Sequence, residues 1–174
     1  HIDFIITKEP GGGPLGKDLR SMLLSKSSQI SPEVELLLMM ADRKNHIDNL
    51  VMPNINKGVW VISDRYLDST YAYQGGGRQI NTSKIDSLVR LLDLPQPNLT
   101  LLFDLSPSIA IDRAKKRSEL DRFESEPMDF HERIRDAYVS LYKDNPERFR
   151  MIDSSADFIE VKEQVEKIIL DFIG

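Results

Sequence analysis

The 174-residue sequence contains no cysteine, one tryptophan and no hydrophobic run close to the roughly 20 residues that a membrane-spanning helix requires. The absence of cysteine excludes a disulfide framework and fits a reducing compartment, so we expect a cytoplasmic protein. The net charge of −5 argues against general nucleic-acid binding, because proteins of that class carry a basic face or stripe. Arginine and lysine side chains must therefore converge locally if the protein binds an anionic substrate.

Short apolar runs alternate with helical patterns along the chain, and no linker or repeat divides it. We expect strands at residues 2–7, 59–63, 100–105 and 149–153. We expect helices at residues 15–24, 34–54, 83–92, 106–116, 130–143 and 157–172. The second helix has a clear start, because Ser31 can cap it, Pro32 suits its first position and Glu33 adds acid to its first turn. The alternation predicts one α/β domain over residues 1–174, with a parallel sheet and helices on both faces.

The most informative segment covers residues 59–78 and reads VWVISDRYLDSTYAYQGGGR. Its apolar start predicts a buried strand, and Asp64 and Arg65 follow at the carboxyl end, where open α/β sheets bind ligands. Arg65 offers a planar fork for a phosphate group, and Asp64 offers a hard oxygen for Mg²⁺ or its waters. Three further side chains could line a pocket for a sugar and a base: Thr70, Tyr73 and Gln74. The glycines at 75–77 could equally form a plain loop.

A second candidate site follows the first strand in the sequence TKEPGGG, residues 7–13. Pro10 fixes one backbone angle, and the glycines allow a ligand to approach the backbone closely. Lys8 and Glu9 would then lie at the binding edge of the sheet. The structural alternative is a turn between strand and helix that needs glycine for geometry alone.

Three residues of the next two helices could complete this site. Arg20 lies on the same side of the chain as the TKEPGGG loop. Met39 and Arg43 are one helical turn apart and share a face. An apolar plate beside a planar double donor suits a flat base with carbonyl acceptors, although a core methionine and a surface arginine would give the same pattern.

A third candidate is the basic segment RAKKRSELDR, residues 113–122. On a helix, Arg113, Lys116 and Arg117 are spaced i, i+3 and i+4 and project together. Phosphoryl transfer needs such a cationic, mobile segment over the transferring group. The structural alternative is a solvated basic helix face.

Together these motifs resemble the thymidylate kinase family, the ATP-dependent dTMP kinases among the P-loop nucleoside monophosphate kinases. TKEPGGG resembles the family's T-R-E-P-G-G, SDRY followed by STYAYQGGGR resembles the bacterial form, and RAKKRSELDRFE resembles the bacterial lid. The resemblance covers essentially the whole chain. It implies a three-layer P-loop kinase fold with a short lid at about residues 113–126, phosphorylation of dTMP to dTDP in dTTP synthesis, Mg²⁺ as cofactor, and a homodimer packed through the helix that starts at Ser31.

The resemblance also assigns an acceptor site. Its residues are Lys8, Glu9, Arg20, Met39, Arg43, Arg65, Thr70, Tyr73 and Gln74. Arg65 would bind the 5′-phosphate of dTMP, with Glu9 and Arg20 around it. Arg43 would hydrogen-bond the thymine edge, helped by Thr70 and Gln74, and Tyr73 would crowd the 2′ position of the sugar and so favour deoxyribose.

For the donor side, the resemblance implies that Asp64 holds Mg²⁺ through water. Arg113, Arg117 and Arg122 would belong to the lid, and Arg117 would act on the transferring phosphoryl group. The loop after the last strand would lie near the adenine of ATP, with Ser155, Ala156 and Asp157.

The sequence departs from the family pattern in three places. Lys8 stands at the usual arginine, and Met39 stands where the family usually has a stacking phenylalanine; methionine can still pack on a ring through its polarisable sulfur. No G-x-x-x-x-G-K-[ST] phosphate loop occurs, and the chain begins at His1 rather than methionine. We therefore expect an upstream βα unit of about 30 residues in the natural protein. The strand of that unit would run through the middle of the sheet.

Two alternatives stay open on the sequence. One is a P-loop kinase for another nucleotide acceptor, against which the set of Arg43, Thr70 and Gln74 argues. The other is a non-catalytic nucleotide binder, or a fragment that has lost its ATP site, and only the missing phosphate loop supports it.

Overall fold

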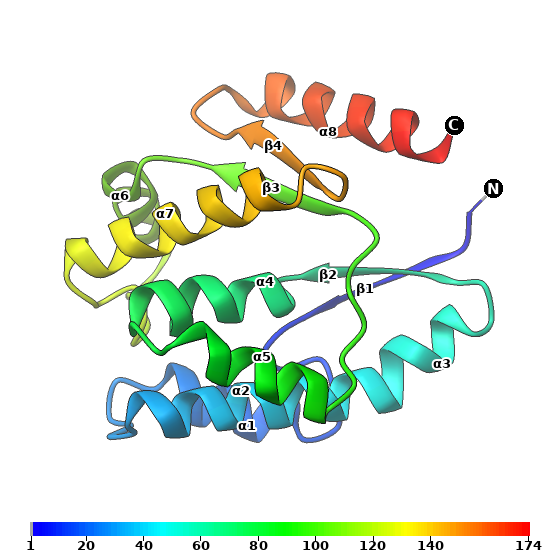
Figure 1. The fold of residues 1–174 in the computed structure, drawn as a ribbon. Coiled ribbons are helices and arrows are strands. Elements are labelled where there is room, and N and C mark those ends of the chain that lie inside the picture. Colours follow the sequence, from blue (N-terminus) through cyan, green and yellow to red (C-terminus); the bar gives the residue numbers. More distant parts are fainter. Residues whose placement is uncertain (1) are drawn as a thin grey trace.

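Four strands form two separate parallel pairs in the computed structural model, which describes residues 2–174 (Figure 1). In the first pair, β1 (Phe4–Lys8) lies beside β2 (Trp60–Asp64) and ends level with it. In the second pair, β3 (Thr100–Asp104) lies beside β4 (Phe149–Asp153) in the same manner. All four predicted strands are confirmed, although residue 1 of the predicted domain lies outside the described residues.

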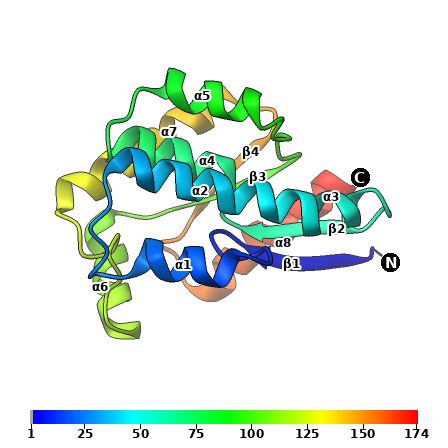
Figure 2. The same ribbon diagram turned by 90° about the horizontal axis from the view of Figure 1, so that it is seen from below.

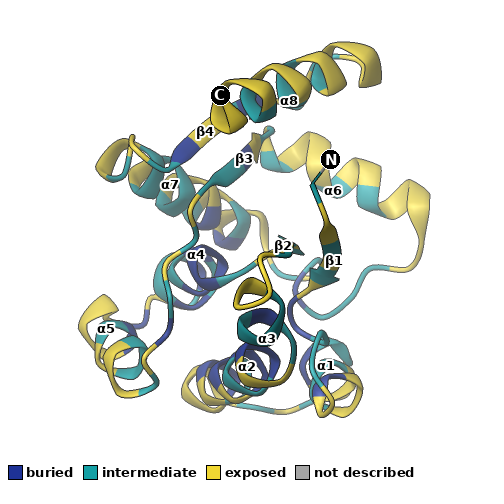
Figure 3. Cartoon of the chain, turned by 90° about the vertical axis from the view of Figure 1, so that its right-hand side faces the viewer, coloured by how far each residue is buried: buried dark blue, intermediate teal, exposed yellow. Residues whose placement is uncertain are grey.

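The strands are parallel, as the sequence predicts, and they form two separate pairs. Within residues 2–174, β2 and β3 are not hydrogen-bonded to each other, and each pair is a sheet of its own. Figure 3, seen from one side of the molecule, shows β2 and β3 as the inner strands of the two pairs. The strands of both pairs point the same way (Figure 1), so the carboxyl ends of all four lie on the same side of the arrangement.

Helices surround both pairs. Their bounds are α1 (Gly16–Leu24), α2 (Pro32–His46), α3 (Met52–Ile55), α4 (Leu67–Thr70), α5 (Thr82–Leu91), α6 (Pro107–Arg117), α7 (Met128–Asp144) and α8 (Phe158–Ile173). A π-helical turn, Ile47–Val51, joins α2 to α3, so the long helix predicted at 34–54 is confirmed. α2 lies between α1 and α5 (Figures 2 and 3). No helix within residues 2–174 combines the length and the apolar character that crossing a membrane requires.

Capping explains where two of these helices begin. The Ser31 side chain accepts a hydrogen bond from the Val34 backbone N–H at 3.3 Å, and Pro32 takes the first helical position. Asp157 accepts from the N–H groups of Ile159 and Glu160 and starts α8 in the same way. Each cap satisfies backbone donors that a helix N-terminus otherwise leaves free.

The segment from α4 to residue 77 is helical, which the sequence does not predict. After α4 the chain continues as a π-helix, Tyr71–Gly77, and this helix packs along α7. A Cβ at Gly77 would lie 2.6 Å from Phe130 Cε2, and one at Gly76 would lie 2.7 Å from Ala137 Cβ. Gly76 and Gly77 are therefore required by the close approach of two helices, and the plain-loop interpretation is wrong.

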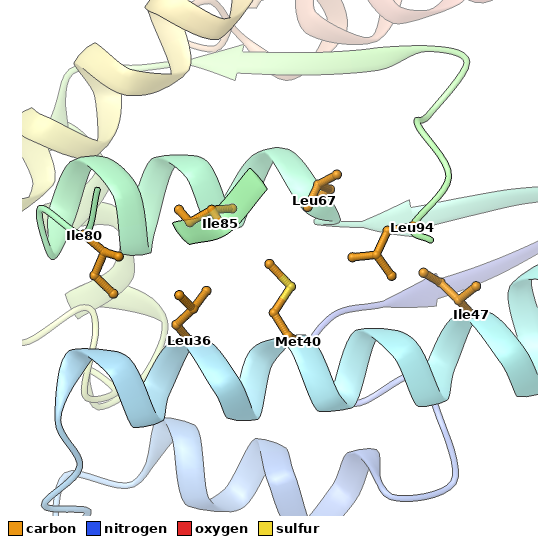
Figure 4. Packing of buried hydrophobic residues seen from close by; sticks show 7 residues of the cluster. All are labelled: Leu36, Met40, Ile47, Leu67, Ile80, Ile85 and Leu94. Atoms are coloured by element: carbon orange, nitrogen blue, oxygen red, sulfur yellow. The ribbon is translucent and has the colours of Figure 1, made fainter. Parts of the chain in front are cut away.

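The main core lies between α2, α5 and the start of α4. Seven buried side chains form it (Figure 4): Leu36, Met40, Ile47, Leu67, Ile80, Ile85 and Leu94. A smaller cluster under α7 contains Ala72, Phe123, Phe130 and Ile134. The first cluster fixes the position of α2, and α2 supplies several of the site residues described below.

The apolar sequence of β2 predicts burial on both faces, and the structure corrects this prediction. Ile62 is 49% exposed, Ile6 on β1 is 75% exposed and Phe103 on β3 is 51% exposed. Trp60 has one aromatic neighbour, Phe172 of α8, at 5.8 Å between ring centroids. The elements within residues 2–174 therefore cover these side chains only in part.

A buried ion pair ties the two strand pairs together through α4. Asp68 accepts hydrogen bonds from both terminal nitrogens of Arg148, at 2.8 and 2.7 Å, and from Thr100 Oγ1 at 2.9 Å. Thr100 begins β3 and Arg148 directly precedes β4, whereas α4 follows β2. The carboxylate therefore fixes the second strand pair relative to the first.

Candidate active site

The carboxyl ends of β1 and β2 meet at one edge. Lys8 lies opposite Asp64, and the Glu9 N–H donates to the Asp64 carbonyl at 2.9 Å. Arg65 follows with a φ of 68°, a conformation that costs a residue with a side chain about 1–3 kcal/mol. Its exposed guanidinium lies 4.7 Å from the centre of the Tyr73 ring. The sheet edge therefore carries an exposed cation on an aromatic platform, beside the exposed carboxylate of Asp64.

Arg43 is almost fully buried, at 2% exposure, and each of its three nitrogens has a partner in the loop after β1 or in the segment after β2. Nε donates to Glu9 Oε2 at 2.7 Å, Nη1 to Thr70 Oγ1 at 2.7 Å, and Nη2 to the Tyr66 carbonyl at 3.0 Å. The structure thus brings Arg43 and Thr70 together, as the resemblance implies, and adds Glu9, which the resemblance placed around the phosphate. A surface position for Arg43, the structural alternative, is wrong.

His46 completes this network and escapes the sequence analysis. Its ring is fully buried, with Nδ1 2.9 Å from Glu9 Oε1 and Nε2 2.8 Å from Thr7 Oγ1. Because a carboxylate only accepts, Nδ1 donates to Glu9, and in the neutral ring Nε2 accepts from the threonine hydroxyl. Gly12 is needed here, since a Cβ would collide with the His46 ring and lie 2.6 Å from Thr7 Oγ1. The spacing of Arg43 and His46, i and i+3 on α2, is the signal that could have found it.

Two side chains hold the TKEPGGG loop from outside this network. Arg20 Nη1 donates to the Pro10 carbonyl at 2.7 Å, so Arg20 does lie beside the loop. Asp42 Oδ2 accepts from the Gly11 N–H at 3.0 Å, whereas its Oδ1 has no partner within residues 2–174. Burial raises the pKa of Asp42 above its ordinary 3.8; the Gly11 hydrogen bond opposes this effect and the neighbouring Glu9 adds to it.

Gln74 lies in a second buried network. Its Nε2 donates to Glu35 Oε1 at 2.8 Å, and Glu35 also accepts from Arg78 Nε at 3.1 Å and from Arg122 Nη2 at 2.7 Å. Glu35 is 1% exposed and Gln74 is fully buried. The sequence gives no signal for Glu35, which lies outside the recognised motifs, and Arg78 ends the STYAYQGGGR motif without pointing to a buried partner.

Met39 and Tyr73 pack in the smaller hydrophobic cluster. The Tyr73 ring meets Phe123 edge-on at 5.6 Å and Phe130 at 6.4 Å. Met39 therefore lies near the tyrosine on which Arg65 rests. This arrangement joins the apolar plate to the phosphate-binding candidate, and Phe123 brings the base of the lid segment to the same place.

The three lid arginines do not share one environment. Arg117 is 70% exposed and pairs with Glu124 at 2.8 Å, and exposed Arg113 donates to the Ser154 carbonyl at 3.0 Å. Arg122 points inward: it donates to the Leu23 carbonyl at 2.8 Å as well as to Glu35. Arg122 thus anchors the segment predicted as a lid, and of the three arginines only Arg113 and Arg117 are exposed.

The loop after β4 is organised by its own side chains. Ser155 donates to Asp153 Oδ1 through both its hydroxyl, at 2.6 Å, and its backbone N–H, at 2.8 Å. These hydrogen bonds lower the pKa of Asp153. Ala156 separates Ser155 from Asp157, which caps α8. The predicted adenine-side residues therefore form one short, ordered turn.

No group of three potential metal-binding side chains occurs within residues 2–174. A protein cage for a metal ion is thus absent from this part of the chain. Mg²⁺ is commonly held by only one or two carboxylates together with waters and substrate phosphates, so the exposed Asp64 at the sheet edge suits that kind of site.

The site combines a strained, exposed arginine for an anion with buried donors and an apolar plate for a planar group. The sequence profile described as thymidylate kinase matches residues 1–165, which is most of the chain. The chain belongs to the thymidylate kinase family.

Individual relatives of the family agree with this membership. A thymidylate kinase from Carboxydothermus hydrogenoformans is 46% identical over 88% of this chain and 75% of its own length. One from Nitrosomonas europaea is 40% identical over 98% of this chain and 80% of its own. The crystal structure of thymidylate kinase from Ehrlichia chaffeensis superposes with a TM-score of 0.75 at 30% identity, covering 96% of this chain and 80% of the other. The P-loop kinase fold predicted from the sequence is thereby confirmed.

The raised pKa of Asp42 predicts a pH-dependent effect of Asp42→Asn. The folded wild type holds its proton to higher pH than the unfolded chain, so this group's contribution to stability falls as pH rises above 3.8. Asparagine does not titrate, and the stability of the variant relative to wild type should therefore increase from pH 4 to pH 7. Urea unfolding at several pH values measures this difference. Asp171→Asn, on exposed α8, is the control, and an equally steep pH dependence in that variant would contradict the assignment to burial.

Proposed function

We propose that the protein transfers the terminal phosphoryl group of ATP to dTMP, giving ADP and dTDP for dTTP synthesis. The observation that carries this proposal is the pairing of Arg43 with Thr70 beside Met39, in a chain of the thymidylate kinase family whose sheet edge presents Arg65. Arg43 donates to the O4 carbonyl of thymine, and Met39 packs on the ring. Thr70 and Gln74 support this edge, and Tyr73 occupies the space that a 2′-hydroxyl would need.

The acceptor phosphate binds at the ends of β1 and β2. Arg65 is its principal ligand, because the Tyr73 ring positions its guanidinium at the strand ends before a phosphate binds. Three side chains lie around the phosphate: Lys8, Glu9 and Arg20. Glu9 acts through its hydrogen bond from Arg43, and Arg20 acts through its hydrogen bond to the Pro10 carbonyl. The attacking phosphate oxygen is already anionic near neutral pH, so the reaction needs no strong base.

The main difficulty of this reaction is bringing two polyanions together. Arg117 and Arg113, on the exposed side of the lid, stabilise the transferring group, while Arg122 holds the lid to Glu35. Asp64 would hold Mg²⁺, and the ion would neutralise charge on the donor phosphates. Ser155, Ala156 and Asp157 border the adenine. Residues 1–174 act as one domain with a lid at about residues 113–126.

The substrate assignment is tested with the complete reading frame and a panel of acceptors. We expect dTMP to be preferred and dUMP to be turned over less efficiently, since one methyl group is worth only about 1–3 kcal/mol. Purine monophosphates should react at least about a hundredfold less well, because they do not fit the donor pattern of Arg43. A coupled ADP assay measures kcat/KM, and EDTA should abolish turnover. Preference for a purine acceptor would overturn the proposal.

The role of Arg65 is tested against that of Lys8. Arg65→Ala should lower kcat/KM for dTMP by roughly 100-fold or more, because it removes a preorganised phosphate ligand. Lys8→Ala should cost less than about tenfold, since the lysine is a flexible point charge at the rim. Lys162→Ala, an exposed cation on α8, is the control and should match wild type. Equal losses for Arg65→Ala and Lys8→Ala would show that the phosphate is bound elsewhere.

We further propose a homodimer that packs through α2. Its outer face carries Val34 at 43% and Leu37 at 54% exposure, and Leu91 of α5 beside it is 77% exposed. Leu37 lines two shallow hollows. One lies between α2 and α5, and the other extends toward Leu15. A second copy of this face would cover the apolar stripe.

Leu37→Glu should therefore give a monomer in light scattering after size exclusion, because it places a charge in the centre of this stripe. Leu170→Glu makes the same change at a comparably exposed leucine on α8 and should leave the dimer intact. A wild type that is monomeric at micromolar concentration would refute the dimer.

We place the protein in the cytoplasm, where its nucleotide substrates occur. The cysteine-free sequence supports this location. Recovery of the native protein in a membrane or secreted fraction would argue against it.

A further inference from the structure

Glu35 is a buried carboxylate to which the proposed reaction assigns only the anchoring of Arg122. At 1% exposure it accepts hydrogen bonds from Gln74, Arg78 and Arg122. The two arginines alone would satisfy its charge. The third partner, Gln74, belongs to the proposed thymine site, so Glu35 connects that site to the base of the lid.

The contact with Glu35 determines which end of the Gln74 amide is free. A carboxylate between two guanidinium groups is an anion and only accepts, so it must face the NH₂ end of the amide, as the 2.8 Å contact from Nε2 shows. The other end, Oε1, is buried and has no hydrogen-bond partner within residues 2–174. A buried acceptor without a donor is unfavourable, and a bound group that donates to it would remove the penalty.

The free acceptor of Gln74 lies in the same frame of two helices as the donors of Arg43. On α2, Glu35, Met39 and Arg43 are spaced i, i+4 and i+8 and share a face. Across from them, Thr70 and Gln74 are four residues apart in the helical segment that starts with α4. Two hydrogen bonds, Arg43–Thr70 and Glu35–Gln74, therefore cross between the same two helices on either side of Met39.

The two ends of this frame have opposite hydrogen-bonding character. Arg43 provides only donors, and Gln74 in this orientation provides an acceptor. The edge of thymine or uracil carries a carbonyl acceptor at O4 next to a donor at N3–H. Cytosine carries the reverse pattern, an amino donor at N4 next to an acceptor at N3.

We propose that Glu35 is a positioning residue for base selectivity: it holds the Gln74 amide so that Oε1 accepts from N3–H and a cytosine ring is rejected. This inference rests on the proposed function. Glu35 does not touch the substrate. It acts through Gln74, and without its anion the amide can turn over and present a donor to the base.

The test measures binding of dTMP and dCMP by calorimetry, using the complete reading frame as wild type, Glu35→Gln and Glu35→Asp. The neutral amide in Glu35→Gln can accept or donate, so the orientation of the Gln74 amide is no longer imposed. We expect dTMP affinity to fall roughly fivefold to tenfold while dCMP affinity does not fall, which lowers selectivity by the same factor. A purely structural role would weaken both ligands equally. Glu126→Gln is the matched control, because Glu126 pairs with Arg78 in the same network without touching Gln74, and its selectivity should equal that of wild type.

An unchanged ratio of the two affinities in Glu35→Gln overturns the proposal. If that variant does not fold, the ratio of the two affinities is measured in Glu35→Asp, and an unchanged ratio there overturns the proposal. Aspartate keeps the charge that Arg78 and Arg122 require but withdraws it from the Gln74 amide. In wild type, the side-chain amide protons of Gln74 should exchange slowly by NMR, and rapid exchange would also overturn the proposal. Wild type that fails to bind dTMP would instead refute the proposed function itself, and the inference with it.

Discussion

The buried guanidinium of Arg43 is the constraint around which the rest of the site is built. A charge with 2% exposure requires an anion and a partner for each donor, because the cost of removing it from water is otherwise large. Glu9 supplies the anion, and Thr70 and the Tyr66 carbonyl each accept from one of the two terminal nitrogens. These partners come from the loop after β1 and from the segment after β2. The requirement of one side chain therefore holds α2 against the carboxyl ends of both strands.

This constraint extends outward in two directions. Glu9 is held in turn by His46, which the Thr7 hydroxyl and Gly12 surround, so the loop after β1 has little freedom. On the other side, the Glu35 network joins α2 to the lid segment through Arg122. The exposed cations, Arg65 and Arg117, are attached to this rigid frame at its rim. A buried, satisfied interior and exposed cations at the edge suit an enzyme that must hold a flat base firmly and meet a phosphate from solvent.

Much of the fold follows from local sequence signals. Both ends of the strand at 149–153 lie where the sequence predicts them. The sequence also predicts the start of α2 at Ser31-Pro32-Glu33, because capping acts over a few neighbouring residues. The helical structure of residues 71–77 is not predicted, because it depends on contacts far along the chain. Three consecutive glycines oppose helix formation locally, and only packing against Phe130 and Ala137 of α7 makes their small size favourable. The exposure of Ile62 fails as a prediction because an apolar strand does not reveal whether a neighbouring element covers it.

The sequence by itself determined which residue types stand at the strand ends, hence the family resemblance and the candidate residues Glu9, Arg43, Arg65, Thr70 and Gln74. Only the tertiary structure decided that Arg43 is buried, that Arg122 faces inward whereas Arg117 faces solvent, and that Glu35 and His46 belong to the site. The physical reason is that motifs and periodicity report local geometry, whereas burial and hydrogen-bond partners depend on residues far along the chain, such as Glu35 with Arg122 and Glu9 with His46. Once a charge is buried, these distant partners determine its position and its hydrogen bonds, and no short stretch of sequence contains them.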